Sequence, residues 1–169
     1  MTTFLGIDPG LAATGIAVVE GAAMSVQRYS FGTIRTEARD PLSRRLNWIY
    51  EEISKILAQV QPDAMVLEDV FSLPRYTKSG IALGQVTGVL MLAGHRAQVP
   101  VAAIAVREVK KVLTGNGNAR KRQLEAAVRR RLHHPETIEP SHASDALALA
   151  LVGLYRSQSL PDQLTCFRS

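Results

Sequence analysis

The chain has 169 residues, of which 46% are hydrophobic, so it is long enough to bury one core and too short for a second large domain. Its 20 Lys and Arg against 15 Asp and Glu give a net charge of +5, which favours an acidic partner such as nucleic acid. An aromatic content of 5% favours contacts to a duplex backbone over stacking on single strands. The single cysteine excludes an internal disulfide and a Cys-based zinc site within one chain, and predicts a reducing compartment.

The N-terminal residues run into a strand-like segment without the basic and apolar regions of a signal peptide, so we expect a cytoplasmic protein. The most apolar stretch, residues 81–93, is shorter than the roughly 20 residues of a spanning helix, and no membrane association is expected. Residues 1–156 are predicted to form a single domain, followed by a flexible tail over 157–169.

The first half of the chain predicts strands around a helix. Three strand-like segments come first, at residues 4–8, 14–19 and 25–30, and their short connections predict an antiparallel meander. Apolar residues spaced by three and four between Leu42 and Val60 predict a helix. Two nearly continuous apolar runs follow, at residues 64–68 and 99–104, and are typical of strands covered by helices on both faces.

Between those two runs, residues 79–97 predict an apolar helix in which Gly80, Gly84 and Gly88 recur every fourth residue. This stripe of glycines could seat another helix closely. The second helix could belong to the same chain or to a second copy across a dimer interface, and the sequence favours neither.

The second half of the chain is more helical and carries the basic charge. A short basic helix is expected after Ile104, then a loop at 114–118, a basic helix at 119–132 and a last helix from Ser141 to about Tyr155. Residues 107–131 contain nine basic side chains against two acidic ones. This segment predicts either phosphate binding or an ordinary solvated helical face.

Three antiparallel strands followed by two parallel strands separated by helices predict an α/β fold with a five-stranded mixed sheet flanked by helices. Ligands of such sheets bind beyond the carboxyl ends of the parallel strands. Asp8 and Glu68 both lie at these ends. Asp8 precedes Pro-Gly and could simply form a turn. Glu68 ends an apolar run, and a carboxylate buried there needs a partner or a metal.

The last predicted helix adds His142 and Asp145, three residues apart and therefore on one face, in a helix rich in alanine. His142 without Asp145 would be an ordinary polar residue of a first turn. Three converging carboxylates repel one another unless a cation neutralises them, so Asp8, Glu68 and Asp145 together imply Mg²⁺ or Mn²⁺. Beside a basic segment, such a cluster indicates phosphodiester chemistry.

Five sequence blocks resemble the RuvC family of Holliday junction resolvases over about residues 3–156. They are Gly6-Ile7-Asp8-Pro9-Gly10 with Thr14-Gly15, Leu67-Glu68-Asp69-Val70-Phe71, Leu83-Gly84-Gln85 with Gly88, Val109-Lys110-Lys111, and Ser141-His142-Ala143-Ser144-Asp145-Ala146-Leu147-Ala148. The resemblance implies a ribonuclease H-like fold, a homodimer, and a metal-dependent endonuclease that resolves four-way DNA junctions by paired symmetric nicks in recombination and repair. It also implies cooperation with a branch-migration helicase.

In the pattern of that family, the metal ligands and catalytic residues correspond to Asp8, Glu68, His142 and Asp145. The expected mechanism is hydrolysis with two Mg²⁺ or Mn²⁺ ions per active site, bridged by Asp8, giving 5′-phosphate and 3′-hydroxyl ends. Better-known members carry Asp at the position of His142, and some relatives are similar to this chain in having His. Because imidazole is a softer ligand than carboxylate, His142 predicts a relative preference for Mn²⁺.

The resemblance further implies DNA contacts. Phe71 matches an aromatic residue that acts against junction bases, although the alternative is a core residue folded over the sheet edge. Lys110 and Lys121 match lysines near the active site, and the neighbouring cations Lys111, Arg120 and Arg122 are expected to share the binding of phosphates. Two alternatives are a noncatalytic junction-binding protein and an ATP-binding relative of the fold, but an ATP-binding relative would need a second domain.

Overall fold

In a computed structural model, residues 1–22, 24–69 and 78–159 are described, and they form a five-stranded sheet flanked by helices. The strand order is β3-β2-β1-β4-β5. The bounds are Thr2–Asp8 for β1, Ala13–Ala22 for β2, Ser25–Arg35 for β3, Ala64–Glu68 for β4 and Val101–Ile104 for β5. β1, β2 and β3 pair antiparallel, whereas β4 is parallel to both β1 and β5. The predicted mixed sheet is therefore confirmed.

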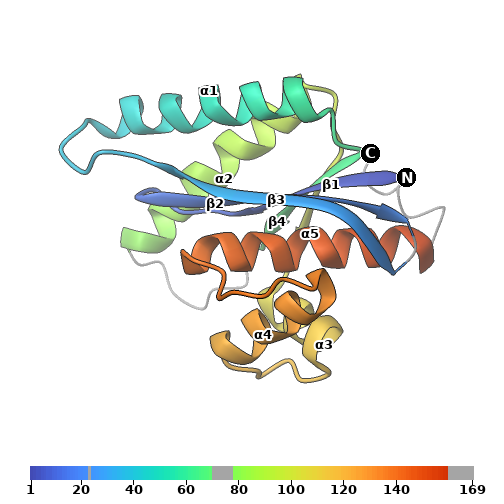
Figure 1. The fold of residues 1–169 in the computed structure, drawn as a ribbon. Coiled ribbons are helices and arrows are strands. Elements are labelled where there is room, and N and C mark those ends of the chain that lie inside the picture. Colours follow the sequence, from blue (N-terminus) through green and yellow to red (C-terminus); the bar gives the residue numbers. More distant parts are fainter. Residues whose placement is uncertain (23, 70–77, 160–169) are drawn as a thin grey trace.

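Helices cover both faces of the sheet (Figure 1). α1 (Leu42–Val60) and α2 (Lys78–Arg96) lie on one face, and α5 (Ser141–Ser159) lies on the other. α3 (Val106–Thr114) and α4 (Lys121–Leu132) lie beyond α5, on its side away from the sheet. This arrangement makes two apolar cores, one between the sheet and the α1–α2 layer and one between the sheet and α5.

Strand alternation decides which side chains face each core. Leu5 and Ile7 belong to the core on the α1–α2 side, whereas Phe4 belongs to the core on the α5 side. Because successive side chains of a strand point to opposite faces, Asp8 shares the face of Phe4. By the same alternation Glu68 shares the face of Val66, which also belongs to the α5 core. Both carboxylates therefore project toward α5.

α5 lies unusually close to the sheet because both surfaces have small residues. A Cβ atom at Gly6 would lie 2.1 Å from the carbonyl oxygen of Ala146, and one at Gly15 would lie 2.0 Å from the carbonyl oxygen of His142. On the helix side, Ala143 and Ala150 are fully buried. The alanines predicted to let α5 approach the sheet thus meet Gly6 on β1, whereas Gly15 on β2 lies against the backbone of His142.

Several element bounds differ from the sequence prediction, and the largest differences are at the ends of β3 and α5. β3 extends to Arg35 rather than ending near residue 30, because its pairing with β2 continues until Arg35 meets Ala13. α5 continues to Ser159, beyond the expected end near Tyr155, and so includes the start of the segment predicted to be a tail. In the described part of the chain, no helix has the length and hydropathy required to cross a membrane.

Candidate active site

Asp8 and Glu68 lie side by side at the carboxyl ends of two parallel strands. In the pairing of β1 with β4, Ile7 lies opposite Leu67. Asp8 and Glu68, the next residue of each strand, therefore lie next to one another. Asp8 is only 6% exposed, and Glu68 is partly buried. The two carboxyl groups also share a hydrogen bond. A protonated Glu68 satisfies this bond by donating to the Asp8 carboxylate.

The first turn of α5 brings His142 against Asp8. Nδ1 of His142 is 2.6 Å from Oδ2 of Asp8, a contact between residues 134 positions apart. A carboxylate only accepts hydrogen bonds, so Nδ1 of His142 carries the proton of this bond. Nε2 is then the ring nitrogen left for another partner.

Asp145, one turn further along α5, contacts a lysine from α4. Nζ of Lys121 is 3.0 Å from Oδ2 of Asp145. Lys121 is the first residue of α4, and the start of this helix is fixed locally, since the side-chain oxygen of Gln123 accepts a hydrogen bond from the backbone N–H of Arg120 at 2.7 Å. The structure therefore brings together the four residues predicted as ligands, with one lysine of the predicted basic group beside them.

The proximity and burial of these acids raise the pKa values of Glu68 and Asp145. Burial, the hydrogen bond with Asp8 and the negative charges of Asp8 and Asp145 together raise the pKa of Glu68 to about 7. Burial also raises the pKa of Asp145, although the contact with Lys121 opposes this shift. The hydrogen bond to Asp145 in turn raises the pKa of Lys121. Without additional positive charge, the site retains a proton on Glu68 near neutral pH.

The cluster fits a divalent cation by its chemistry. Carboxylate oxygens are the ligands that Mg²⁺ and Mn²⁺ prefer, and the raised pKa of Glu68 shows that the acids lack positive charge. Within residues 1–22, 24–69 and 78–159, no three His, Cys, Asp or Glu side chains are already arranged to hold a metal ion. Binding of a cation by these acids would require Glu68 to lose its proton and Asp145 to exchange Lys121 for the cation.

The pKa of Glu68 predicts how the stability of the metal-free protein depends on pH. The unfolded state loses this proton near pH 4.5 and the folded state near pH 7, so stability falls as the pH rises between these values. Glu68→Gln stays neutral and removes the penalty, which we expect to be about 1 to 2 kcal/mol after solvent screening. In EDTA, the melting temperature of Glu68→Gln should exceed that of the wild type by about 2 to 8 °C at pH 8 and match it at pH 4.5. Exposed Glu136→Gln is the control, and an equal gain at both pH values would contradict the prediction.

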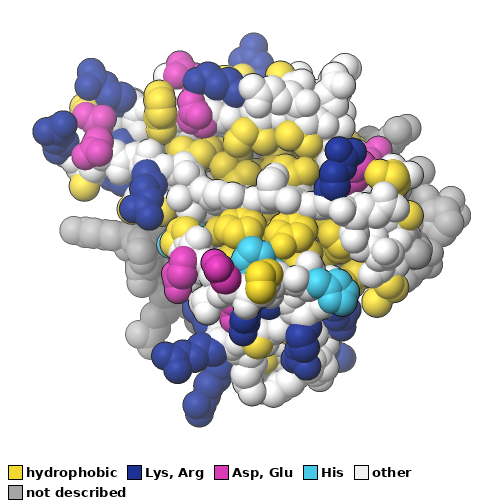
Figure 2. Space-filling view, viewed as in Figure 1, with side chains coloured by type: hydrophobic (Ala, Val, Ile, Leu, Met, Phe, Trp, Pro, Cys, Tyr) yellow, Lys and Arg dark blue, Asp and Glu magenta, His cyan; other side chains and the backbone are white. Residues whose placement is uncertain are grey.

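The predicted DNA-binding cations surround the acidic cluster but do not all enter it. Figure 2 shows Lys and Arg gathered over the α3–α4 region. Lys111, Arg120 and Arg122 are exposed, and Lys110 is partly buried on α3. The predicted cation that contacts the acidic cluster is Lys121, through Asp145. Phe71, predicted to act on junction bases, lies outside the described residues.

Sequence reasoning missed the residues that bring α5 to the acids. Gly6 and Gly15 are required by the close approach of α5, and the only signal in the sequence was glycine within strand patterns opposite an alanine-rich helix. Thr14 was also missed as a structural residue. Its buried hydroxyl donates a 2.7 Å hydrogen bond to the carbonyl of Gly10 and holds the turn that follows Asp8.

Comparison with known sequences gives one consistent result. The family described as crossover junction endodeoxyribonuclease RuvC matches residues 4–153. The chain is 38% identical to the protein of that name from Thermomicrobium roseum, over 87% of this chain and 89% of the relative. It is also 38% identical to the one from Rhodopirellula baltica, over 94% of this chain and 89% of the relative.

Solved structures agree with the sequence comparison. RuvC of Thermus thermophilus in complex with a Holliday junction substrate superimposes with a TM-score of 0.88 at 29% identity, covering 94% of this chain and 96% of that one. A second structure of the Thermus thermophilus protein gives a TM-score of 0.82 at 30% identity, over 93% of this chain and 96% of that one. The fold is accordingly the ribonuclease H-like fold predicted from the sequence.

Proposed function

This chain belongs to the family of RuvC crossover junction endodeoxyribonucleases, and we propose that it resolves four-way DNA junctions by paired symmetric nicks through two-metal-ion hydrolysis. The observation that supports this most strongly is the convergence of Asp8, Glu68, His142 and Asp145, with Lys121, at one end of the sheet. A binding protein has no need for buried acids whose pKa values are raised. A phosphodiesterase uses such acids to hold cations.

In this proposal, Asp8, Glu68, His142 and Asp145 would hold two Mg²⁺ or Mn²⁺ ions, and the chemistry that these ions would supply is activation of water and stabilisation of the leaving 3′ oxygen. Asp8 also orients the imidazole of His142 through the Nδ1 bond and leaves Nε2 available as a ligand. Lys121, once released from Asp145, provides a cation for the scissile phosphate. The exposed basic side chains of α3 and α4 hold the flanking backbone. The products are 5′-phosphate and 3′-hydroxyl ends.

The test is cleavage of an end-labelled four-way junction, compared with linear duplex, in Mg²⁺ and in Mn²⁺. Paired nicks confined to the junction, and lost in Asp145→Asn while junction binding persists, are the expected result. Junction binding without nicks under every condition would instead establish a noncatalytic junction-binding protein.

We propose that the functional unit is a homodimer formed through α2. Beyond the adjoining residues and the backbone of the same helix, no described atom lies within 4 Å of a Cβ built at Gly84 or Gly88, so these two glycines do not seat a described helix of their own chain. Ile81 and Leu92, on the same outward side, are 55% and 50% exposed. Two like active sites on a twofold dimer match the two strands to be cut in a twofold junction.

Gly88→Leu is expected to weaken the dimer at least about tenfold, because the new side chain occupies the space that the partner helix needs. The monomer should melt at or slightly above the wild-type temperature, since replacing glycine in a helix interior gains about 1 kcal/mol of helix propensity. Sedimentation equilibrium measures the association, and Ala58→Leu on exposed α1 is the control. A Gly88→Leu protein that dimerises like the wild type would exclude α2 as the interface.

His142→Asp is expected to lower the ratio of the activity in Mn²⁺ to the activity in Mg²⁺, because it replaces a softer imidazole with a hard carboxylate beside Asp8. Single-turnover cleavage at matched metal concentrations measures this ratio. Ser141→Asp places the same charge on the preceding exposed residue and serves as the control. An unchanged ratio in His142→Asp would show that His142 does not set the metal preference.

The wider setting follows from the family. We propose that a branch-migration helicase delivers the junction, that the reaction takes place in the cytoplasm, and that Phe71 separates junction bases as an apolar wedge. Residues 1–156 are proposed to act as one nuclease domain.

A further inference from the structure

The helical hairpin, residues 106–132, carries nine of the 20 Lys and Arg residues yet lies on the far side of α5 from the sheet (Figure 1). Val109 and Leu124 are among its side chains that pack into the core shared with α5. Apolar packing of ridges into grooves sets the distance between two helices and sets their crossing angle only to within about 15 to 20°. The placement of Lys121 against Asp145 therefore depends on whatever else restrains α4.

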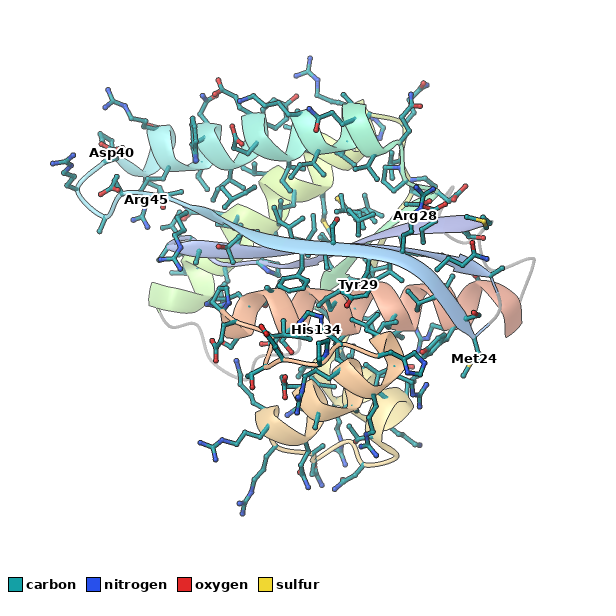
Figure 3. The ribbon with its side chains drawn as sticks, in the orientation of Figure 1. Met24, Arg28, Tyr29, Asp40, Arg45 and His134 are labelled. Carbon is teal, nitrogen blue, oxygen red and sulfur yellow. The ribbon has the colours of Figure 1, made fainter. Side chains whose placement is uncertain are left out.

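A second attachment lies at the opposite end of α4. The hydroxyl of Tyr29, on edge strand β3, is 2.7 Å from Nδ1 of His134, just beyond the end of α4. The rings of Tyr29 and His134 meet edge to face at 5.8 Å, and Phe31 meets His134 in the same manner at 5.7 Å. Tyr29 and Phe31 also stack on one another, with ring centroids 6.5 Å apart. Figure 3 shows Tyr29 and His134 facing one another between β3 and the residues below it.

His134 is tied to α4 by its backbone. α4 ends at His133, whose positive φ of 51° turns the chain, and the backbone N–H of His134 donates to the carbonyl of Arg129 at 3.0 Å. A movement of the imidazole therefore moves the last turn of α4.

The segment after His134 is tied to α4 as well, and it leads directly to α5. The backbone N–H of Ile138 donates to a carboxylate oxygen of Glu125 at 3.1 Å, and Glu125 also pairs with Arg129 at 2.9 Å. His134 thus lies between the helix that supplies Lys121 and the helix that supplies His142 and Asp145.

The contact between Tyr29 and His134 holds in both charge states of the imidazole. Neutral His134 with its proton on Nε2 accepts the Tyr29 hydroxyl proton at Nδ1, and a protonated His134 donates from Nδ1 to the same oxygen. The contact between Tyr29 and His134 therefore does not require one particular charge state of the imidazole.

We propose that Tyr29 and His134 are positioning residues, a clasp that fixes α4 against the sheet and so sets Lys121 against Asp145. Because this rests on the proposed nuclease function, losing the clasp is expected to slow cleavage while leaving junction binding unchanged. Binding depends on many exposed cations, whereas the reaction depends on the placement of one.

The test compares Tyr29→Phe, which removes only the hydroxyl, with His134→Ala and His134→Asn. Asn places an oxygen where Nδ1 lies and should rescue the contact. Tyr29→Phe and His134→Ala are each expected to slow single-turnover junction cleavage about three- to tenfold, with junction affinity within about twofold of the wild type. The double variant should be no slower than either single variant, and His134→Asn should cleave near the wild-type rate.

Amide hydrogen exchange of α4 provides a readout that does not depend on cleavage. Exchange in α4 should become about three- to tenfold faster in Tyr29→Phe, and remain unchanged in Tyr50→Phe on α1 at the other face of the sheet. If no variant nicks junctions, faster exchange still establishes the clasp and the proposed function fails alone. Wild-type cleavage and exchange in Tyr29→Phe would overturn the clasp, as would equal slowing by His134→Asn and His134→Ala.

Discussion

Asp8→Asn is expected to slow junction cleavage about a hundred- to thousandfold in either metal, a loss of transition-state stabilisation of the size that one electrostatic group supplies. Asp8 bonds His142 through Oδ2, shares a hydrogen bond with Glu68, and is almost fully buried at the end of the central strand. An amide keeps the shape of the carboxylate but has no charge to hold a cation.

The same variant should leave the fold and the binding of DNA intact. Junction affinity, measured by fluorescence anisotropy in EDTA, is expected within about twofold of the wild type, because the exposed basic side chains remain. Asp40→Asn, a carboxylate that pairs with Arg44 on the surface, should cleave normally. If the Asp8→Asn protein retained a tenth of the wild-type rate, Asp8 would not take part in the chemical step.

Gly15→Ala is expected to destabilise the protein by about 3 kcal/mol or more. The added methyl group would overlap backbone atoms, which cannot move aside as the end of a flexible side chain can. The added Cβ would lie 2.0 Å from the carbonyl oxygen of His142. α5 would have to move away from β2, which takes His142 from Asp8 and opens the core. Cleavage should fall with stability, and thermal unfolding measures the effect as a decrease of roughly 6 to 12 °C.

Gly32→Ala is the matched control. Gly32 lies on neighbouring β3, opposite Ile16, and no described atom is within 4 Å of its Cβ position. This substitution should be neutral or slightly stabilising, since it reduces the entropy of the unfolded chain. Equal melting temperatures for the two variants would show that α5 has room to retreat.

The sheet and its acidic positions were predictable because they depend on local patterns. Apolar runs before Asp8 and Glu68 indicated buried strands, and strand alternation placed both carboxylates on one face. The spacing of His142 and Asp145 placed them on one side of α5. That these four residues meet, through the 2.6 Å contact between His142 and Asp8, follows from strand order and the resemblance together.

Other features were not predictable because they join segments distant in sequence. The sequence placed Lys121 near the site by resemblance but did not identify Asp145 as its partner. Nothing local to Tyr29 or His134 indicated their contact, since 105 positions separate them. For the glycine stripe, the sequence allowed an internal or an external partner, and the finding that bears on this choice is the open space at Gly84 and Gly88 among described residues.

The site joins the first strand of the fold to its last helix, and this has a consequence for synthesis on the ribosome. Asp8 emerges before His142, which follows 134 positions later in the chain. α5 also fills the core against β1 and β2, so the nascent chain lacks both the assembled acidic cluster and one of its two apolar cores until α5 is released. Completion of this core and assembly of the acidic cluster therefore occur in one late step of synthesis.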